Sequence, residues 1–272
     1  MRREPARASC GRPRRRPWTA CRVRPDGPLG RRAEPPAPAV GPGPVVAPAV
    51  AEGPTAVVSP VALGSVRAVN PHDVQEAYSS LAQRYIDLLG SVEVVHPDDL
   101  RLIERHLAHL SGPVLDLGCG PGHLTGHLHG AGCEVTGIDL VPEFVAHARR
   151  AHPGVPFEVG SLTDVDRADA SVAGALAWYS LIHVEPGRLD GALLGVRRLL
   201  VPGGTLVVGF FEGPVREPLE HRVTTAYRWP VDEMAGRLTS AGFVEVERSR
   251  RPQEGERRPH AVLVVRAGRP SR

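Results

Sequence analysis

The chain of 272 residues is long enough for one or two domains and carries a formal net charge of +3. Residues 1–32 hold eleven arginines against two acids, so the remainder carries a net charge of −6. The basic character therefore gives no reason to expect a nucleic-acid-binding core. Four scattered cysteines exclude a disulfide framework, and no Cys/His cluster has the spacing of a zinc site.

Residues 1–65 differ from the rest of the chain. They are crowded with Arg, Pro, Ala and Gly, and proline recurs too often for a helix or a strand. We predict a disordered extension here and one domain over residues 66–272. Because the chain has no lysine, as is typical of a GC-rich genome, a natural start near Val66 is an alternative. Three prolines interrupt the apolar residues 45–63, which excludes a signal core or membrane span and favours a cytoplasmic protein.

Two helices are predicted at the start of the domain. Asn70 can cap a helix over residues 73–89, in which apolar residues recur at helical spacing. A second helix is predicted over residues 98–110, where an apolar stripe ends before Gly112. Residues 73–110 are therefore expected to supply the N-terminal helices of the domain.

Strands and helices then alternate along the chain, which predicts a parallel sheet with helices on both faces. A short polar segment containing Gly255 joins the last two strands, so they form a hairpin and one late strand runs antiparallel. The predicted fold is α/β, doubly wound and Rossmann-like, with a mostly parallel seven-stranded sheet and an antiparallel edge hairpin. The predicted strands are 114–118, 133–138, 156–159, 172–178, 204–210, 243–249 and 260–266, and the predicted helices are 122–130, 142–151, 188–200 and 230–241.

The most informative segment is VLDLGCGPGHLT, residues 114–125. A buried apolar strand runs into Gly118, Gly120 and Gly122 and then into a helix that begins near His123. Glycines let the backbone turn tightly and lie against a flat ligand, and the helix start directs free N–H groups at that ligand. The pattern predicts a nucleotide-like cofactor, and a glycine-rich loop that binds nothing is the alternative.

The glycine spacing separates two kinds of cofactor. A dinucleotide turn is written G-x-G-x-x-G and holds a pyrophosphate at the helix start. Here the third glycine comes one residue early, and His123 stands where that fingerprint needs glycine. Asp116, two residues before the first glycine, would repel a pyrophosphate and suit a cationic ligand. An NAD-dependent oxidoreductase is therefore a disfavoured alternative.

Asp139 ends the second predicted strand, 17 residues after Gly122. An acid at this position can accept both hydroxyls of a ribose, and a solvated acid or a cap of the helix from Pro142 is the alternative. Ligands on such sheets sit at the carboxyl ends of the strands, where the strand order reverses. We therefore expect one crevice lined by residues 116–122, 139, 160–162 and 179–183.

These motifs, in this order, resemble those of the class I S-adenosylmethionine (SAM)-dependent methyltransferases. The resemblance begins with the strand, glycine turn and acid, and it covers residues 70–268. It implies the fold derived above, SAM as the cofactor and methyl transfer as the activity, with no metal. The later matching segments are FEVGSLTDVD (157–166), GALAWYSLIHV (174–184), VRRLLVPGGTLVVGFF (196–211), LTSAGFVEVE (238–247) and HAVLVVRA (260–267).

The resemblance also implies roles for individual residues. The glycine turn and the acid before it lie at the methionine end of SAM, and Asp139 takes the ribose hydroxyls. Leu140 and Leu162 border the two faces of adenine. Ser161 stands where the family often carries an Asp that bonds the adenine amino group, and this departure leaves its role open. The expected cofactor-binding residues are Asp116, Gly118, Cys119, Gly120, Gly122, Asp139, Leu140, Ser161, Leu162 and Tyr85.

The expected catalytic residues are His183 and Tyr179. His183 follows the fourth strand and can act as a general base, because the unperturbed pKa of histidine is about 6.5. Tyr179 and Ser180 are expected to face the methyl group. Tyr78 and Tyr85, seven residues apart, share one face of the first helix, and in similar proteins this helix folds over SAM. One tyrosine is therefore expected to close the pocket, and core packing is the alternative.

A motif that the sequence lacks narrows the range of possible acceptors. No Asn/Asp-Pro-Pro-aromatic motif follows the fourth strand, where residues 178–180 read Trp-Tyr-Ser, which disfavours methylation of nucleic-acid amino groups. We expect a small-molecule acceptor, with neither a specific nucleic acid nor a membrane as partner. The acceptor atom and the oligomeric state stay open, and a SAM- or nucleoside-binding protein without turnover is the second alternative. The loop after the fifth strand, which often shapes the acceptor site, contains Glu212, His221, Tyr227 and Trp229.

Overall fold

The computed structural model describes residues 70–255 and 257–268, so the extension predicted over residues 1–65 lies outside the described residues. The strands are β1 (Val114–Leu117), β2 (Val135–Asp139), β3 (Phe157–Val159), β4 (Val172–Trp178), β5 (Leu200–Phe211), β6 (Glu217–Leu219), β7 (Ala226–Arg228), β8 (Phe243–Arg251) and β9 (His260–Ala267). The helices are α1 (Pro71–Ser80), α2 (Ala82–Leu89), α3 (Pro97–Leu107), α4 (His123–Gly130), α5 (Pro142–Ala151), α6 (Leu189–Leu199) and α7 (Val231–Ser240), and the short 3₁₀ helices are η1 (Val92–Val94) and η2 (Leu181–His183).

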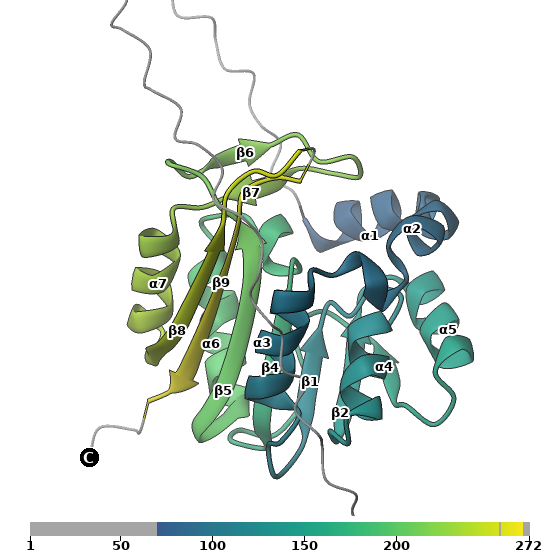
Figure 1. Ribbon diagram of the computed structural model, residues 1–272, viewed down its shortest axis with the longest axis horizontal. Coiled ribbons are helices and arrows are strands. Elements are labelled where there is room, and N and C mark those ends of the chain that lie inside the picture. The colour runs from purple at the N-terminus through teal and green to yellow at the C-terminus, as the bar shows by residue number, and fades with distance from the viewer. Residues whose placement is uncertain (1–69, 256, 269–272) are drawn as a thin grey trace, which may run out of the picture. The chain divides into compact units, whose positions relative to one another are not determined.

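Seven of the strands form one sheet in the order β3-β2-β1-β4-β5-β9-β8 (Figure 1). The strands from β3 to β5 pair in parallel, whereas β9 runs antiparallel to both β5 and β8. The predicted doubly wound, mostly parallel sheet with an antiparallel edge hairpin is thus confirmed. The order reverses between β1 and β4, and the carboxyl ends of these two strands open the crevice in which such sheets bind ligands.

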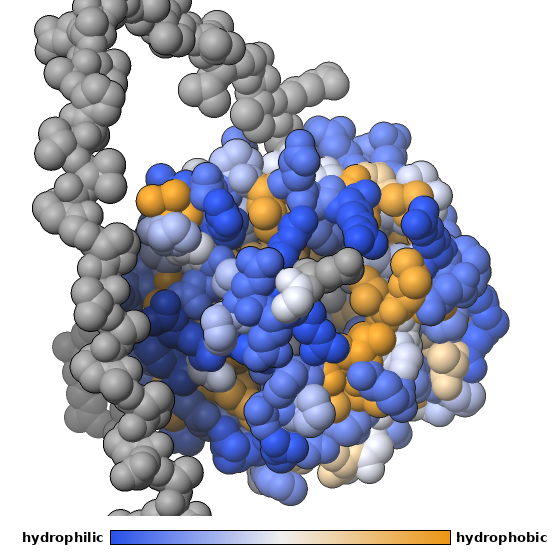
Figure 2. Space-filling model, turned by 45° about the horizontal axis from the view of Figure 1, so that its top comes forward, coloured by the Kyte–Doolittle hydropathy of each residue, from blue (hydrophilic) through white to orange (hydrophobic). Residues whose placement is uncertain are grey.

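Helices cover both faces of the sheet because alternate residues of its strands are apolar on both sides. On β9, Val262 and Val264 pack with helices α3 and α4, whereas Leu263 and Val265 pack on the opposite face with α6 and α7. On the face that Figure 2 presents, hydrophilic side chains predominate and hydrophobic ones gather in separate groups. In the described part of the chain, no helix is long and apolar enough to cross a membrane.

Two local features differ from the sequence prediction. The single helix expected over residues 73–89 is broken at Leu81, whose φ of −117° and ψ of 8° leave the helical region and separate α1 from α2. The segment after β5 was expected to be a loop, but it contains the two-stranded antiparallel pair of β6 and β7. Each of these strands has only three residues, too few for a period-2 pattern to stand out in the sequence.

Candidate cofactor and acceptor site

The glycine turn after β1 is shaped by close approaches of the backbone. Gly118 has a φ of +76°, and a Cβ atom there would lie 2.3 Å from Cβ of Ser180. A Cβ atom on Gly122 would lie 2.7 Å from Cβ of Ala148, and Gly122 borders neither cavity described below. Gly120 differs, because a Cβ atom there would meet no protein atom within 4 Å and would project into open space. The first and third glycines therefore serve packing, and the second keeps room free for a ligand.

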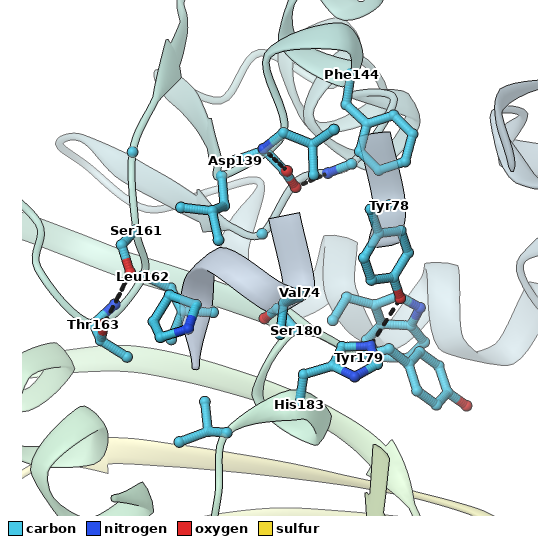
Figure 3. A pocket seen from close by; sticks show the side chains of 18 of the residues that line it. Val74, Tyr78, Asp139, Phe144, Ser161, Leu162, Thr163, Tyr179, Ser180 and His183 are labelled. Atoms are coloured by element: carbon cyan, nitrogen blue, oxygen red, sulfur yellow. Dashed lines mark hydrogen bonds between the residues drawn. The ribbon is translucent and has the colours of Figure 1, made fainter. Parts of the chain in front are cut away.

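Asp139, at the end of β2, is tied to this turn. Its Oδ2 accepts a hydrogen bond from the backbone N–H of Gly120 at 2.7 Å, and its Oδ1 accepts one from Val141 at 2.9 Å (Figure 3). The residue is 8% exposed, and burial raises the pKa of its carboxyl group to about 6 although the backbone donors oppose the shift. Each oxygen keeps a second lone pair, so the carboxylate can still accept two ribose hydroxyls.

A second acid is buried beneath the turn. Asp116 on β1 is 1% exposed, and its Oδ2 accepts a hydrogen bond from Oγ1 of Thr125 at 2.7 Å. Burial raises the pKa of Asp116 to about 7; the hydrogen bond from Thr125 opposes this shift, and the neighbouring charge of Asp139 adds to it. Two buried carboxylates at one glycine turn favour a cationic ligand and oppose a pyrophosphate.

The predicted adenine-binding segment borders the same crevice. Leu140, Ser161 and Leu162 line a cavity together with Asp139 and Gly120. The Ser161 hydroxyl lies 2.8 Å from that of Thr163, and it also accepts a hydrogen bond from the Thr163 backbone N–H at 3.3 Å (Figure 3). Ser161 is therefore held at the rim of this cavity, where its oxygen can still accept a bond from a ligand amino group.

Aromatic side chains wall the same cavity near Asp139. The ring centroids of Tyr78 on α1 and Tyr85 on α2 lie 5.4 Å apart in an edge-on arrangement, and Phe144 on α5 lies 5.9 Å from Tyr78 and 5.1 Å from Tyr85. Both tyrosines line the cavity, and burial raises the pKa of Tyr85 to about 12, so the hydroxyl stays neutral. Aromatic faces attract cations, so this wall and the two buried acids both favour a cationic ligand.

His183 lies at the end of η2 beside this wall. Its Nδ1 is 2.8 Å from the carbonyl oxygen of Thr225, and its Nε2 is 2.8 Å from the Tyr78 hydroxyl. Because a carbonyl oxygen only accepts, Nδ1 carries the proton and donates, and the Tyr78 hydroxyl donates to Nε2 (Figure 3). Burial lowers the pKa of His183, so the ring is neutral near pH 7 and carries a basic nitrogen.

Tyr179 belongs to a different group of buried polar side chains. Its hydroxyl contacts Nδ1 of His260 and points away from Tyr78 and His183 (Figure 3). Nε2 of His260 lies 3.5 Å from Oδ1 of Asp99 on α3, and the other oxygen of Asp99 bonds Arg251. Tyr179 itself has a φ of +53°, an uncommon conformation for a bulky residue. The sequence analysis missed this group because Asp99 and His260 occur in unremarkable local sequences.

All the expected cofactor residues except Gly122 line one or both of two adjoining cavities. The first cavity is lined by Gly118, Gly120, Asp139, Leu140, Ser161, Leu162 and Tyr85, and the second by Asp116, Gly118, Cys119, Gly120 and Tyr85. The second cavity, of about 440 Å³, also receives Tyr179 and His221, so the predicted loop after β5 reaches it. Of the other loop residues, Trp229 is fully buried in the core and Glu212 pairs with Arg250. Within the described residues, no group of three His, Cys, Asp or Glu side chains is placed to bind a metal ion.

Known proteins share both the sequence pattern and the fold. The model of a family described as "Methyltransferase domain" matches residues 114–204. A ubiquinone biosynthesis O-methyltransferase of Nitrosococcus oceani is 32% identical over 199 residues, covering 69% of this chain and 79% of that protein. A malonyl-[acyl-carrier protein] O-methyltransferase of Erwinia billingiae is 28% identical over 142 residues, which are 52% of this chain and 55% of that protein. The chain thus spans about half the length of several curated relatives.

Solved structures give the same fold. The 1,6-didemethyltoxoflavin-N1-methyltransferase of Burkholderia thailandensis, bound to S-adenosylhomocysteine, aligns with a TM-score of 0.61 and 24% identity, over 74% of this chain and 92% of that one. The [4+2]-cyclase SpnF aligns with a TM-score of 0.63 and 18% identity, over 74% and 98%. The chain belongs to the class I SAM-dependent methyltransferases. The cofactor of this family is SAM.

Proposed function

We propose that the protein transfers the methyl group of SAM to a small-molecule acceptor. One observation carries the proposal: two buried carboxylates, Asp116 and Asp139, flank a glycine turn that faces an aromatic wall. This arrangement suits a ligand that joins a ribose to a positive charge, as a sulfonium nucleoside does. It disfavours NAD, because a pyrophosphate would lie beside uncompensated negative charge.

The binding roles follow from the contacts of each residue. Asp139 accepts the ribose hydroxyls while its backbone donors, Gly120 and Val141, hold the carboxylate in place. Leu140 and Leu162 border adenine, and Ser161 accepts a bond from the adenine amino group. The turn formed by residues 118–120 receives the methionine end, with Asp116 behind it.

Bound SAM supplies an activated methyl group on a sulfonium, so the chain mainly has to orient the acceptor in line with the methyl–sulfur bond. Orientation alone can lower such a barrier by about 7–11 kcal/mol in favourable cases. Trp178, Tyr179 and Gly120 border both cavities, so an acceptor in the second cavity lies beside the methionine end of the first.

We assign proton removal to His183, acting through Tyr78. As the acceptor loses its proton to the Tyr78 oxygen, the Tyr78 proton passes along the 2.8 Å hydrogen bond to Nε2 of His183. The Thr225 carbonyl oxygen, which accepts from Nδ1, stabilises the imidazolium that forms. Tyr179 has the same relation to His260 and is the second proton acceptor that we propose.

The acceptor class is inferred from the site and from the relatives. Two kinds of O-methyltransferase are among the curated relatives, and an N1-methyltransferase shares the fold, so oxygen and nitrogen acceptors are both compatible with this scaffold. A cavity of about 440 Å³ suits a small molecule. We also propose that the protein acts in the cytoplasm on a free metabolite, without a nucleic acid or a membrane.

A second candidate is a SAM-binding protein that does not transfer the methyl group. The likeness to the [4+2]-cyclase SpnF supports this candidate, because SpnF has the same fold but is named for an activity other than methyl transfer. Methyl transfer needs no obligatory catalytic side chain, so the two candidates share every binding contact described above. Detection of a methylated product distinguishes them.

The test has two stages. Calorimetry with SAM, S-adenosylhomocysteine and NAD should give binding of the first two and none of NAD; the opposite result overturns the proposal. Incubation with SAM labelled on its methyl group and a metabolite extract should then give a labelled product of low molecular mass. Binding without any labelled product would favour the non-catalytic candidate.

A further inference from the structure

The second cavity is lined by two buried ring nitrogens that lack partners. Among the described residues, Nδ1 of His123 and Nδ1 of His221 form no hydrogen bond. Buried polar groups without partners are costly, so their presence in one cavity favours a polar ligand. His260 and Asp99 also line the cavity, but Nε2 of His260 and Oδ1 of Asp99 lie 3.5 Å from each other and pair within the protein.

The same cavity is bordered by three arginines from the end of β8 and the turn that follows it. Arg251 is neutralised by Asp99, to which it donates a hydrogen bond at 3.1 Å. Arg258 donates to the carbonyl oxygen of Glu220 at 2.7 Å, which satisfies a donor without removing its charge. Within the described part of the chain, neither Arg257 nor Arg258 forms a salt bridge. Both arginines line the cavity and are exposed, so each brings a positive charge to it.

Aromatic rings form the wall below these charges. The ring centroids of Trp178 and Tyr179 lie 5.5 Å apart, and those of Tyr179 and Phe211 lie 4.8 Å apart. The guanidinium of Arg258 lies 5.6 Å above the Phe211 ring, so the positive charge and the aromatic wall adjoin. A flat molecule against this wall can direct one end to the arginines and the other to the glycine turn.

From this juxtaposition we infer that the acceptor is a small aromatic oxyanion, a ring that carries a carboxylate or a phosphate. Arg257 and Arg258 bind the anionic group, since guanidinium matches both oxyanions in geometry and charge. His221, whose Nδ1 forms no hydrogen bond among the described residues, supplies a hydrogen bond to a polar substituent on the ring. This inference rests on the proposed function, because the second cavity receives the acceptor only when SAM fills the first.

The test compares matched probes on the protein saturated with S-adenosylhomocysteine. The pairs are 3,4-dihydroxybenzoate with 3,4-dihydroxybenzamide, and phenyl phosphate with phenol, each measured by calorimetry. We expect at least one anion to bind about tenfold or more tightly than its neutral partner, as charge-assisted hydrogen bonds to arginine predict. The larger of the two advantages shows whether the site prefers carboxylate or phosphate.

Two variants test whether the arginines cause the tighter binding of the anion. The double variant Arg257→Gln/Arg258→Gln should lose it, whereas Arg150→Gln, which removes an exposed arginine that lines neither cavity, should keep it. Equal binding of anion and neutral partner, no binding of either anion, or an advantage that survives the double variant each overturns the inference while the proposed function stands. Failure of S-adenosylhomocysteine itself to bind overturns both.

Discussion

The Tyr78 hydroxyl donates a hydrogen bond to Nε2 of His183 across 2.8 Å, although 105 residues separate the two in the chain. The bond joins α1, a helix without a fully buried residue, to the loop that follows β4. Its direction is fixed because the other ring nitrogen of His183 donates to a carbonyl oxygen. The one basic nitrogen of the ring thus accepts its hydrogen bond from the tyrosine hydroxyl.

Replacing Tyr78 by Phe should separate catalysis from binding. The ring remains to wall the cofactor, so affinity for SAM should change little, whereas turnover should fall by about 10²-fold with loss of the proton path. Loss of the hydrogen bond should also lower stability by about 1 kcal/mol. Tyr85→Phe is the control, because the Tyr85 hydroxyl forms no hydrogen bond in the described structure. Equal turnover of the two variants would remove Tyr78 from the mechanism.

Asp139→Ala should weaken SAM binding by about 1–3 kcal/mol, because the ribose hydroxyls lose charge-assisted hydrogen bonds. The exposed Asp166, which borders neither cavity, provides a matched control in Asp166→Ala. Calorimetry on the three proteins measures the difference. Affinity that is unchanged in Asp139→Ala would place the ribose elsewhere.

The two buried acids make stability and binding respond to pH in opposite directions. The pKa is about 7 for Asp116 and about 6 for Asp139, both above the ordinary value of 3.8, so the folded state binds these protons more tightly than the unfolded state. Their contribution to the stability of the ligand-free protein therefore rises as pH falls from about 8 to about 5. SAM affinity should instead decrease below about pH 6, as Asp139 loses its charge.

Asp116→Asn tests the stability part of this prediction. The amide oxygen can still accept the bond from Thr125, and the cost of a buried charge disappears. At about pH 8, the ligand-free variant should be more stable than the natural chain by about 1–3 kcal/mol, with a gain that shrinks toward about pH 5. Thermal unfolding at several pH values measures it, and a gain independent of pH would contradict the assigned cause.

Two glycine substitutions in one turn should have different effects. Gly120→Ala places a methyl group in open space at a φ of +54°, so the protein should fold with a loss of about 1 kcal/mol and bind SAM at least tenfold more weakly. Gly118→Ala places its methyl group 2.3 Å from Cβ of Ser180, so its unfolding temperature should drop much further. Melting curves with and without SAM compare them, and full SAM affinity in Gly120→Ala would show that the turn does not face the cofactor.

The sequence predicted the sheet, and it singled out most of the residues that line the candidate cofactor site, because both depend on local signals. Apolar periodicity marks the strands, and the spacing of Gly118, Gly120 and Asp139 reflects one turn and one helix. The Tyr179–His260–Asp99 group could not be predicted. Its three members belong to the end of β4, to β9 and to α3, in that order, and they meet only after the sheet assembles. Contacts between residues so far apart produce no recognisable spacing pattern in the sequence.

The two cavities share the glycine turn and four aromatic side chains, but each also has lining residues of its own. The carboxylates and glycines that suit the nucleoside all fall within residues 114–204, the part matched by the family model, whereas Asp99, Phe211, Arg251 and His260 lie outside it. On the proposed assignment, replacing segments outside residues 114–204 would change the acceptor and leave the methyl donor in place. A chimera that receives the β8–β9 hairpin of a relative is the natural route to redirecting this scaffold toward a new acceptor.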